Sequence, residues 1–169
     1  MLCLQDKVTL HGLAQDDDNV IYADPQPGIR IGRTNAVPEP GSSPAPLDAA
    51  IGLTFEQVLL DGSVELVLRP QPLAVGSEEP LYLHGGALAT CVDTAGWYAV
   101  TARRPGTWIA LNLSCEFLRL ADRRPLTVHA TCRKVGGTTA VVDVTIFRQE
   151  ERDRPVAVGR ATFFRTGDD

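Results

Sequence analysis

One acidic residue, Asp93, stands in an otherwise uncharged apolar stretch that opens with two glycines. The stretch runs from His84 through Gly85 and Gly86 to Ala95, and it is typical of a mostly buried helix. Burying a lone carboxylate costs on the order of several kcal/mol unless the group is paired or used. The glycine-rich helix start offers backbone N–H groups and partial positive charge, which suit a developing oxyanion. A carboxylate near such a donor could hydrolyse an acyl compound, by attacking it or by activating water.

The spacing of these two groups has a geometric consequence. Gly85 and Asp93 are eight positions apart, which at about 1.5 Å per residue separates them by roughly 12 Å along the helix. A reacting carbonyl should lie about 3 Å from both the attacking atom and the oxyanion donor. One helix cannot present both groups to one carbonyl. If both take part, they come from different subunits, and a symmetric dimer would hold two equivalent composite sites.

Alternating apolar residues predict the elements that position this helix. Two short strands, over residues 53–59 and 64–68, flank the turn signal Asp61-Gly62 and predict a hairpin. We expect a loop over residues 70–80 and then a helix from Gly85 to about Arg103. The helix has one apolar stripe for packing on a sheet and a second stripe that carries Asp93. The apolar stripe is Leu88, Val92, Ala95, Ala99 and Ala102, and the second is Thr90, Asp93, Trp97 and Thr101.

Four further strands are predicted after the helix, within residues 108–117, 126–133, 140–146 and 155–164. In the first, strict alternation would place five apolar residues on one face: Ile109, Leu111, Leu113, Cys115 and Phe117. Short turns join the closing strands, so that part of the sheet should be antiparallel. The order of elements predicts an α+β fold with one helix on one sheet. This leaves a sheet face and the strand edges poorly covered, which favours a homodimer, with a homotetramer built as a dimer of dimers left open.

Composition limits the class of protein. The 169 residues fit one domain, and a net charge of −5 argues against nucleic acid as a partner. We expect neither a membrane-spanning segment nor a signal peptide, because we find no long apolar run and no basic segment followed by an apolar core near the first residue. The four cysteines, Cys3, Cys91, Cys115 and Cys132, have no metal or redox spacing, so we expect free thiols and a cytoplasmic location. Residues 1–47 form a proline-rich arm without an assigned function, and residues 48–169 form the folded domain.

A known family shows the same pattern. The run from Leu83 to Ala87, Asp93 nine positions beyond His84, and the strand over residues 112–121 resemble the hotdog superfamily. The resemblance covers about residues 48–166 and is specifically to acyl-CoA thioesterases of the phenylacetate-degradation type. It implies a hotdog fold, in which a curved antiparallel sheet wraps a long central helix. It also implies hydrolysis of an acyl-CoA thioester to a free acid and CoA, with the pantetheine arm between subunits. CoA is then part of the substrate, and neither a separate cofactor nor a metal is expected.

The resemblance also implies roles for individual residues. Asp93 matches the family carboxylate that acts as nucleophile or general base, and Gly85 matches the glycine whose N–H binds the thioester carbonyl. Gly86 would let the substrate approach the backbone, and His84 would support the site. Glu78 stands six residues before His84, where the family often has a substrate-positioning Asn. Ala110 stands where a member can carry Ser or Thr.

The remaining candidates are weaker. Trp97 lies on the same side of the helix as Asp93 and is therefore a better candidate than Tyr98 for the wall of an acyl pocket. Asn112 is a candidate substrate contact. Five arginines could bind CoA phosphates or simply be solvated: Arg103, Arg104, Arg119, Arg123 and Arg124.

A purely structural role is the alternative for Asp93, for His84 and for the two glycines that follow it. Asp93 could cap or pair with a nearby Thr or Arg, His84 could be a helix-start residue without chemistry, and the glycines could serve close helix–sheet packing. The alternative function is a non-catalytic acyl-CoA-binding or regulatory hotdog protein. A dehydratase or hydratase is disfavoured, because the chain lacks a recognisable histidine-plus-acid motif.

Overall fold

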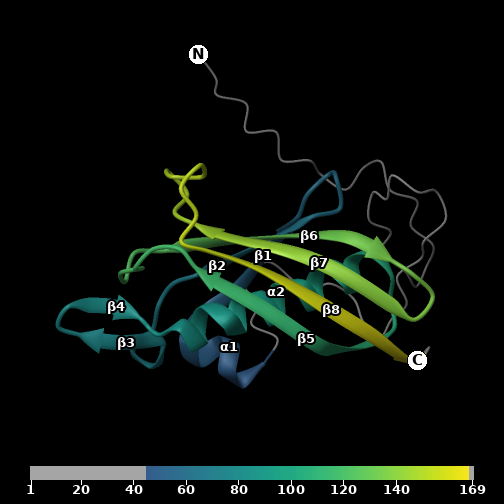
Figure 1. Ribbon diagram of the computed structural model, residues 1–169, viewed down its shortest axis with the longest axis horizontal. Coiled ribbons are helices and arrows are strands. Elements are labelled where there is room, and N and C mark those ends of the chain that lie inside the picture. Colours follow the sequence, from purple (N-terminus) through teal and green to yellow (C-terminus); the bar gives the residue numbers. More distant parts are fainter. Residues whose placement is uncertain (1–44, 168–169) are drawn as a thin grey trace, which may run out of the picture.

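The computed structural model describes residues 45–167, and most of the predicted arm, residues 1–44, lies outside that range (Figure 1). In chain order the helices and strands are α1 (Pro46–Ile51), β1 (Leu53–Val58), β2 (Val64–Leu68), the 3-10 helix η1 (Pro72–Ala74), β3 (Val75–Glu78), β4 (Leu81–Leu83), α2 (Gly85–Arg103), β5 (Thr107–Phe117), β6 (Leu126–Val135), β7 (Thr139–Phe147) and β8 (Ala157–Gly167).

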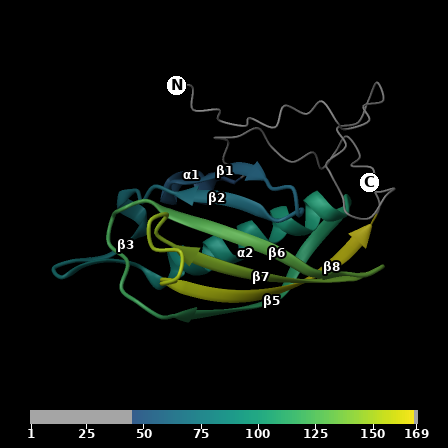
Figure 2. The ribbon, with the colours of Figure 1, turned by 90° about the horizontal axis from the view of Figure 1, so that it is seen from above.

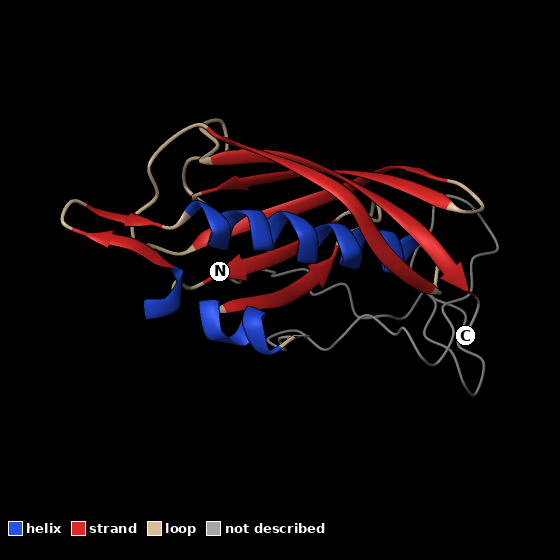
Figure 3. Ribbon diagram, turned by 60° about the horizontal axis from the view of Figure 1, so that its bottom comes forward, coloured by secondary structure: helices blue, strands red, loops and turns tan. Residues whose placement is uncertain are grey.

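A six-stranded antiparallel sheet curves around the long helix α2 (Figures 1 and 2). The strand order is β1-β2-β6-β7-β8-β5, so β1 and β5 are the two edges. Figure 3 shows α2 running along the length of the sheet on one face. The predicted α+β architecture, with one helix against one antiparallel sheet, is confirmed.

The predicted apolar stripe of α2 is the face that packs on the sheet. Its five residues are all buried: Leu88, Val92, Ala95, Ala99 and Ala102. At about 100° per residue, Asp93 lies roughly opposite Ala95 on the helix surface. Packing of the stripe therefore turns Asp93 away from the sheet.

Two glycines allow the close approach of helix and sheet. A Cβ at Gly96 of α2 would lie 2.8 Å from the Phe163 ring, and a Cβ at Gly159 of β8 would lie 2.7 Å from the Ser114 carbonyl oxygen and from a Val92 methyl group. Neither contact leaves room for a methyl group in a close-packed interior. Gly96 and Gly159 are therefore glycines that allow the helix to pack closely on the sheet.

The first hairpin forms as predicted, and the predicted loop does not. Strands β1 and β2 pair antiparallel around a turn in which Gly62 has a φ of 77°. Residues 70–80, expected to form a loop, instead contain η1 and β3, and β3 pairs with β4 in a separate two-stranded sheet. These strands have four and three residues, too few to produce a recognisable alternation.

A β-bulge in β5 overturns the predicted alternation of that strand. Ala110 opposes Phe163 of β8 and Asn112 opposes Thr162, so Leu111 is an extra residue on β5. The insertion exchanges the two faces of the strand from that point on. The expectation that the odd-numbered apolar residues from 109 to 117 share one face is wrong.

Beyond the bulge, β5 directs apolar side chains towards the helix. Leu113, Cys115 and Phe117 oppose residues of β8 that lie on the helix side of the sheet: Ala161, Gly159 and Ala157. Cross-strand partners project to the same face. Ile109, before the bulge, opposes Phe164 on the outer face.

The uncovered part of the sheet is the β5 edge. Ile109, Leu111, Leu113 and Phe117 are 39–56% exposed. On the outer face, by contrast, Asp143 forms ion pairs with Arg133 and Arg160. Ion pairs therefore occupy part of the outer face, and exposed apolar side chains gather along the β5 edge.

We expect Gly159→Ala to destabilise the fold by about 1–3 kcal/mol, because the new methyl group would meet the β5 backbone and Val92. Denaturant unfolding followed by circular dichroism measures the change. Gly137→Ala is the matched control, since no atom of the described part of the chain lies within 4 Å of its Cβ position. Equal stability of the two variants would contradict this account of the packing.

Candidate active site

His84 organises the start of α2. It is the N-cap residue, with φ −66° and ψ 132°, and its Nδ1 accepts a 2.8 Å hydrogen bond from the Gly86 N–H. A Cβ at Gly86 would lie 2.8 Å from the same Nδ1 atom. His84 therefore has a helix-capping role, and Gly86 is small because the imidazole ring lies against it.

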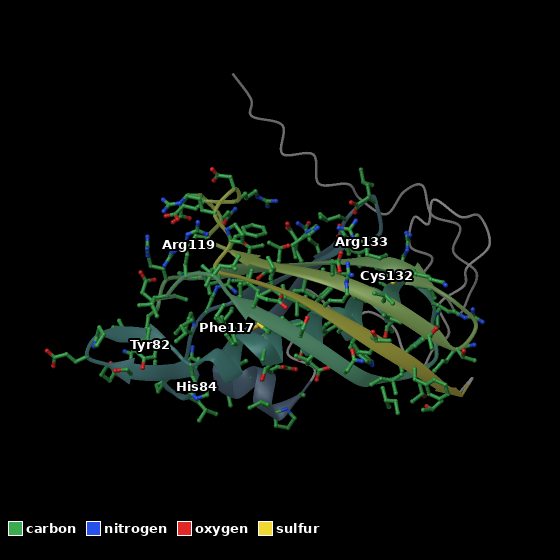
Figure 4. All side chains as sticks on the ribbon, viewed as in Figure 1. Tyr82, His84, Phe117, Arg119, Cys132 and Arg133 are labelled. Carbon is green, nitrogen blue, oxygen red and sulfur yellow. The ribbon has the colours of Figure 1, made fainter. Side chains whose placement is uncertain are left out.

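The Gly85 amide is the open donor at this helix start. Among residues 45–167 its N–H has no hydrogen-bond acceptor, as expected for the first residue of a helix. The ring of Phe117 lies beside Gly85, 3.0 Å from the position of a Cβ. His84 and Phe117 lie at the beginning of α2 in Figure 4. The N–H of Gly85, at the positive end of the helix dipole, can therefore bind an anionic or carbonyl oxygen.

Asp93 is a half-buried carboxylate with no hydrogen-bond or ion-pair partner among the described residues. Burial raises its pKa above the ordinary value. It forms no hydrogen bond or ion pair within the part of the chain that the structure describes, and the adjacent Thr94 hydroxyl donates to Asp48 instead. The alternative in which Asp93 caps or pairs with a nearby Thr or Arg is therefore not observed there. Such a group is available to a substrate or a water molecule.

Asp48 is a second buried carboxyl that sequence reasoning missed. It is 2% exposed and accepts a 2.9 Å hydrogen bond from the Thr94 hydroxyl. Burial raises the pKa of Asp48, against the lowering effect of hydrogen bonds from Thr94 and the Ala45 backbone; the nearby Asp93 charge raises it further. Its place two residues after Pro46 is a capping position at the start of α1, and that was the available signal.

An aromatic series fixes Trp97, one helical turn beyond Asp93. The Trp97 and Tyr98 rings meet edge to face at 5.3 Å, and Tyr98 stacks on Phe55 at 4.9 Å. Tyr98 is fully buried, and within residues 45–167 its hydroxyl has no hydrogen-bond partner. Burial, and next the Asp48 charge, raise the pKa of that hydroxyl. Trp97 itself is partly exposed and packs against the core, which suits a pocket wall.

The structure does not bring Glu78 and Asn112 to Asp93 within one chain. Glu78 is an exposed residue of β3 and forms an ion pair with Arg123. The β3–β4 hairpin extends beyond the start of α2 (Figure 1). Asn112 follows the bulge and lies with Thr162 on the outer face of the sheet. Ala110 is an exposed residue of the edge strand β5.

The five candidate arginines are engaged in local contacts. Four donate to carbonyl oxygens or pair with a nearby carboxylate: Arg103 to Asp61, Arg104 to Gly136, Arg119 to Pro155, and Arg124 to Asp122. Arg123 pairs with Glu78. These contacts account for their positions without a ligand.

Three of the four cysteines lie among the described residues 45–167. Cys91, Cys115 and Cys132 are free thiols, and Cys3 lies outside the described residues. Burial raises the pKa of Cys132 to about 11. Among residues 45–167 no group of His, Cys, Asp and Glu could hold a metal ion. No helix in that range is long and apolar enough to cross a membrane.

Part of this chain is similar in sequence to known proteins. Residues 82–163 match the model of the thioesterase superfamily. A Halobacterium salinarum protein that is named as an esterase is 34% identical over 89 residues, which are 48% of this chain and 58% of that protein. The match thus spans less than two thirds of the length of this relative.

Solved structures agree on the architecture. The E. coli PaaI protein, from the phenylacetic acid degradation operon, has a TM-score of 0.63 and 26% identity, covering 74% of this chain and 87% of its own. A hypothetical thioesterase of Streptococcus pneumoniae, solved with coenzyme A, has a TM-score of 0.60 and 27% identity, covering 69% and 90%. The fold is a hotdog fold, as expected, and the comparisons support the thioesterase superfamily.

We expect Thr94→Val to lower the free energy of unfolding by about 1–3 kcal/mol near neutral pH, because it leaves the buried Asp48 carboxylate without its hydroxyl donor. The loss should shrink in acid, where Asp48 is protonated. Denaturant unfolding at two pH values measures both effects. Thr90→Val is the control, since its hydroxyl donates only to the Gly86 carbonyl of the same helix. A Thr94→Val effect no larger than this control would refute the role.

Proposed function

We propose that this protein is an acyl-CoA thioesterase that hydrolyses a thioester to a free acid and CoA. The observation that carries the proposal is the half-buried Asp93 carboxylate, which has no partner among residues 45–167 and lies on a helix whose first amide, Gly85, is also open there. The superfamily match and the coenzyme A in the Streptococcus pneumoniae structure support a CoA ester as substrate. Similarity to PaaI supports the phenylacetate-degradation type.

A homodimer completes the site in this proposal. The donor and the carboxylate, eight residues apart on one helix, are separated by roughly 12 Å, too far to serve one carbonyl. The exposed apolar edge strand β5 contacts α2 and is the natural surface for a second copy. The proposal requires that pairing through this edge bring Asp93 of the partner subunit close to Gly85. A dimer of dimers would add contacts elsewhere without changing this requirement.

Each residue then has a defined task. The Gly85 N–H donates to the thioester oxygen as negative charge develops on it. In the base-assisted route, Asp93 takes a proton from water, whose oxygen attacks the carbonyl carbon. The carbon–sulfur bond breaks, and CoA leaves as a thiolate that takes up the proton. In the nucleophilic route, the carboxylate itself attacks and water releases the acid from the resulting anhydride.

The surrounding residues support these steps. His84 holds the helix start through its bond to the Gly86 amide, and Trp97 forms a rigid wall on the acyl side. No step requires a separate cofactor. The buried thiol of Cys91 suits a reducing compartment, so a cytoplasmic location is part of the proposal.

We expect Asp93→Asn to lower kcat on acyl-CoA by about 10² or more, because the amide can neither accept the proton nor attack. Release of free CoA from a panel of acyl-CoAs, followed with a thiol reagent, measures turnover. In the wild type, activity should rise with pH through an apparent pKa above the ordinary 3.8, since burial raises the pKa of Asp93. Asp153→Asn, on an exposed turn, is the matched control.

Unchanged turnover in folded Asp93→Asn would exclude Asp93 from the chemistry. Binding of acyl-CoAs by the wild type without any release of CoA would instead identify the non-catalytic binding protein.

A further inference from the structure

Phe117 combines a large exposed surface with a specific contact. The residue is 55% exposed at the end of β5, and its ring edge lies 3.0–3.4 Å from the Cβ position of Gly85. An exposed aromatic ring gains little by packing on a glycine alone. Its contact partner is the residue that carries the open amide.

The bulge in β5 explains why the ring points there. Phe117 opposes the buried Ala157 of β8 and therefore lies on the helix side of the sheet, whereas unbroken alternation from Ile109 would place it on the outer face. Leu113 and Cys115 project to the same side. Together these three residues form an apolar strip that runs along β5 and ends at Gly85.

The position of the ring leaves the donor itself free. At a helix start the N–H groups point along the helix axis, away from the body of the helix. Phe117 contacts Gly85 on the side that would carry a side chain. The ring thus borders Gly85, while the His84 imidazole lies against the adjacent Gly86.

We propose that Phe117 is a substrate-contacting residue, whose ring packs against the thioester bound at Gly85 and excludes water from the amide–oxygen hydrogen bond. This inference rests on the proposed function. A hydrogen bond to a developing oxyanion is stronger where water is excluded.

The test compares Phe117→Ala with Phe117→Leu and with Phe164→Ala, which removes a 38% exposed ring from the outer face of β8. We expect Phe117→Ala to lower kcat on the order of tenfold with a smaller change in KM, because water then reaches the oxyanion. Phe117→Leu should recover part of kcat. Phe164→Ala should keep wild-type kcat, and all three variants should have similar Tm values.

A binding measurement separates this proposal from the proposed function. A dethia acyl-CoA, with CH₂ in place of the thioester sulfur, keeps the carbonyl and cannot be hydrolysed in the same way. We expect Phe117→Ala to weaken its Kd several-fold by calorimetry, whether or not the protein turns over acyl-CoA. Wild-type kcat and Kd in folded Phe117→Ala would overturn the proposal. If the wild-type protein binds the analogue but releases no CoA from acyl-CoAs, only the proposed hydrolysis is overturned.

Discussion

A carboxylate half removed from water, with no partner among residues 45–167, is the constraint on which the rest of this structure depends. The packing of α2 creates it: the small apolar stripe fits the curved sheet, and the opposite side of the helix must then carry Asp93. The neighbouring Thr94 hydroxyl, which could have bonded to it, is held by Asp48. Asp48 therefore has a hydrogen-bond partner in this fold and Asp93 has none among residues 45–167, which is the arrangement that the proposed role of Asp93 requires.

The same helix separates the two halves of the proposed chemistry. Its first turn holds an open amide at Gly85, framed by the His84 and Phe117 rings, and its third turn holds Asp93. Helix geometry forbids them from meeting in one chain. The β5 edge could meet this requirement, because it is an apolar border of the sheet and contacts α2. In the proposed function, both the assembly of the dimer and the completion of its active site would depend on this strand.

Strong periodic signals allowed much of this to be predicted from sequence. The buried stripe of α2, its start at Gly85 and the β1–β2 hairpin follow from spacing and turn chemistry. The bulge at Leu111 could not be predicted, because one inserted residue leaves the alternation of residue types intact while exchanging the faces. Asp48 was missed because its partner is 46 residues away in sequence. Glu78 is predicted as a site residue only from its spacing to His84. In the structure it lies in the β3–β4 hairpin and forms an ion pair with Arg123.

Subunit complementation tests the composite site most directly. Gly85→Pro removes the amide proton and suits the first position of a helix, and Asp93→Asn removes the carboxylate. Each variant alone should be nearly inactive. After co-refolding, half of the dimers are mixed, and each mixed dimer has one intact site, so the account predicts about a quarter of wild-type activity per chain. Activity no higher than that of the separate variants, in a sample shown to contain mixed dimers, would contradict it.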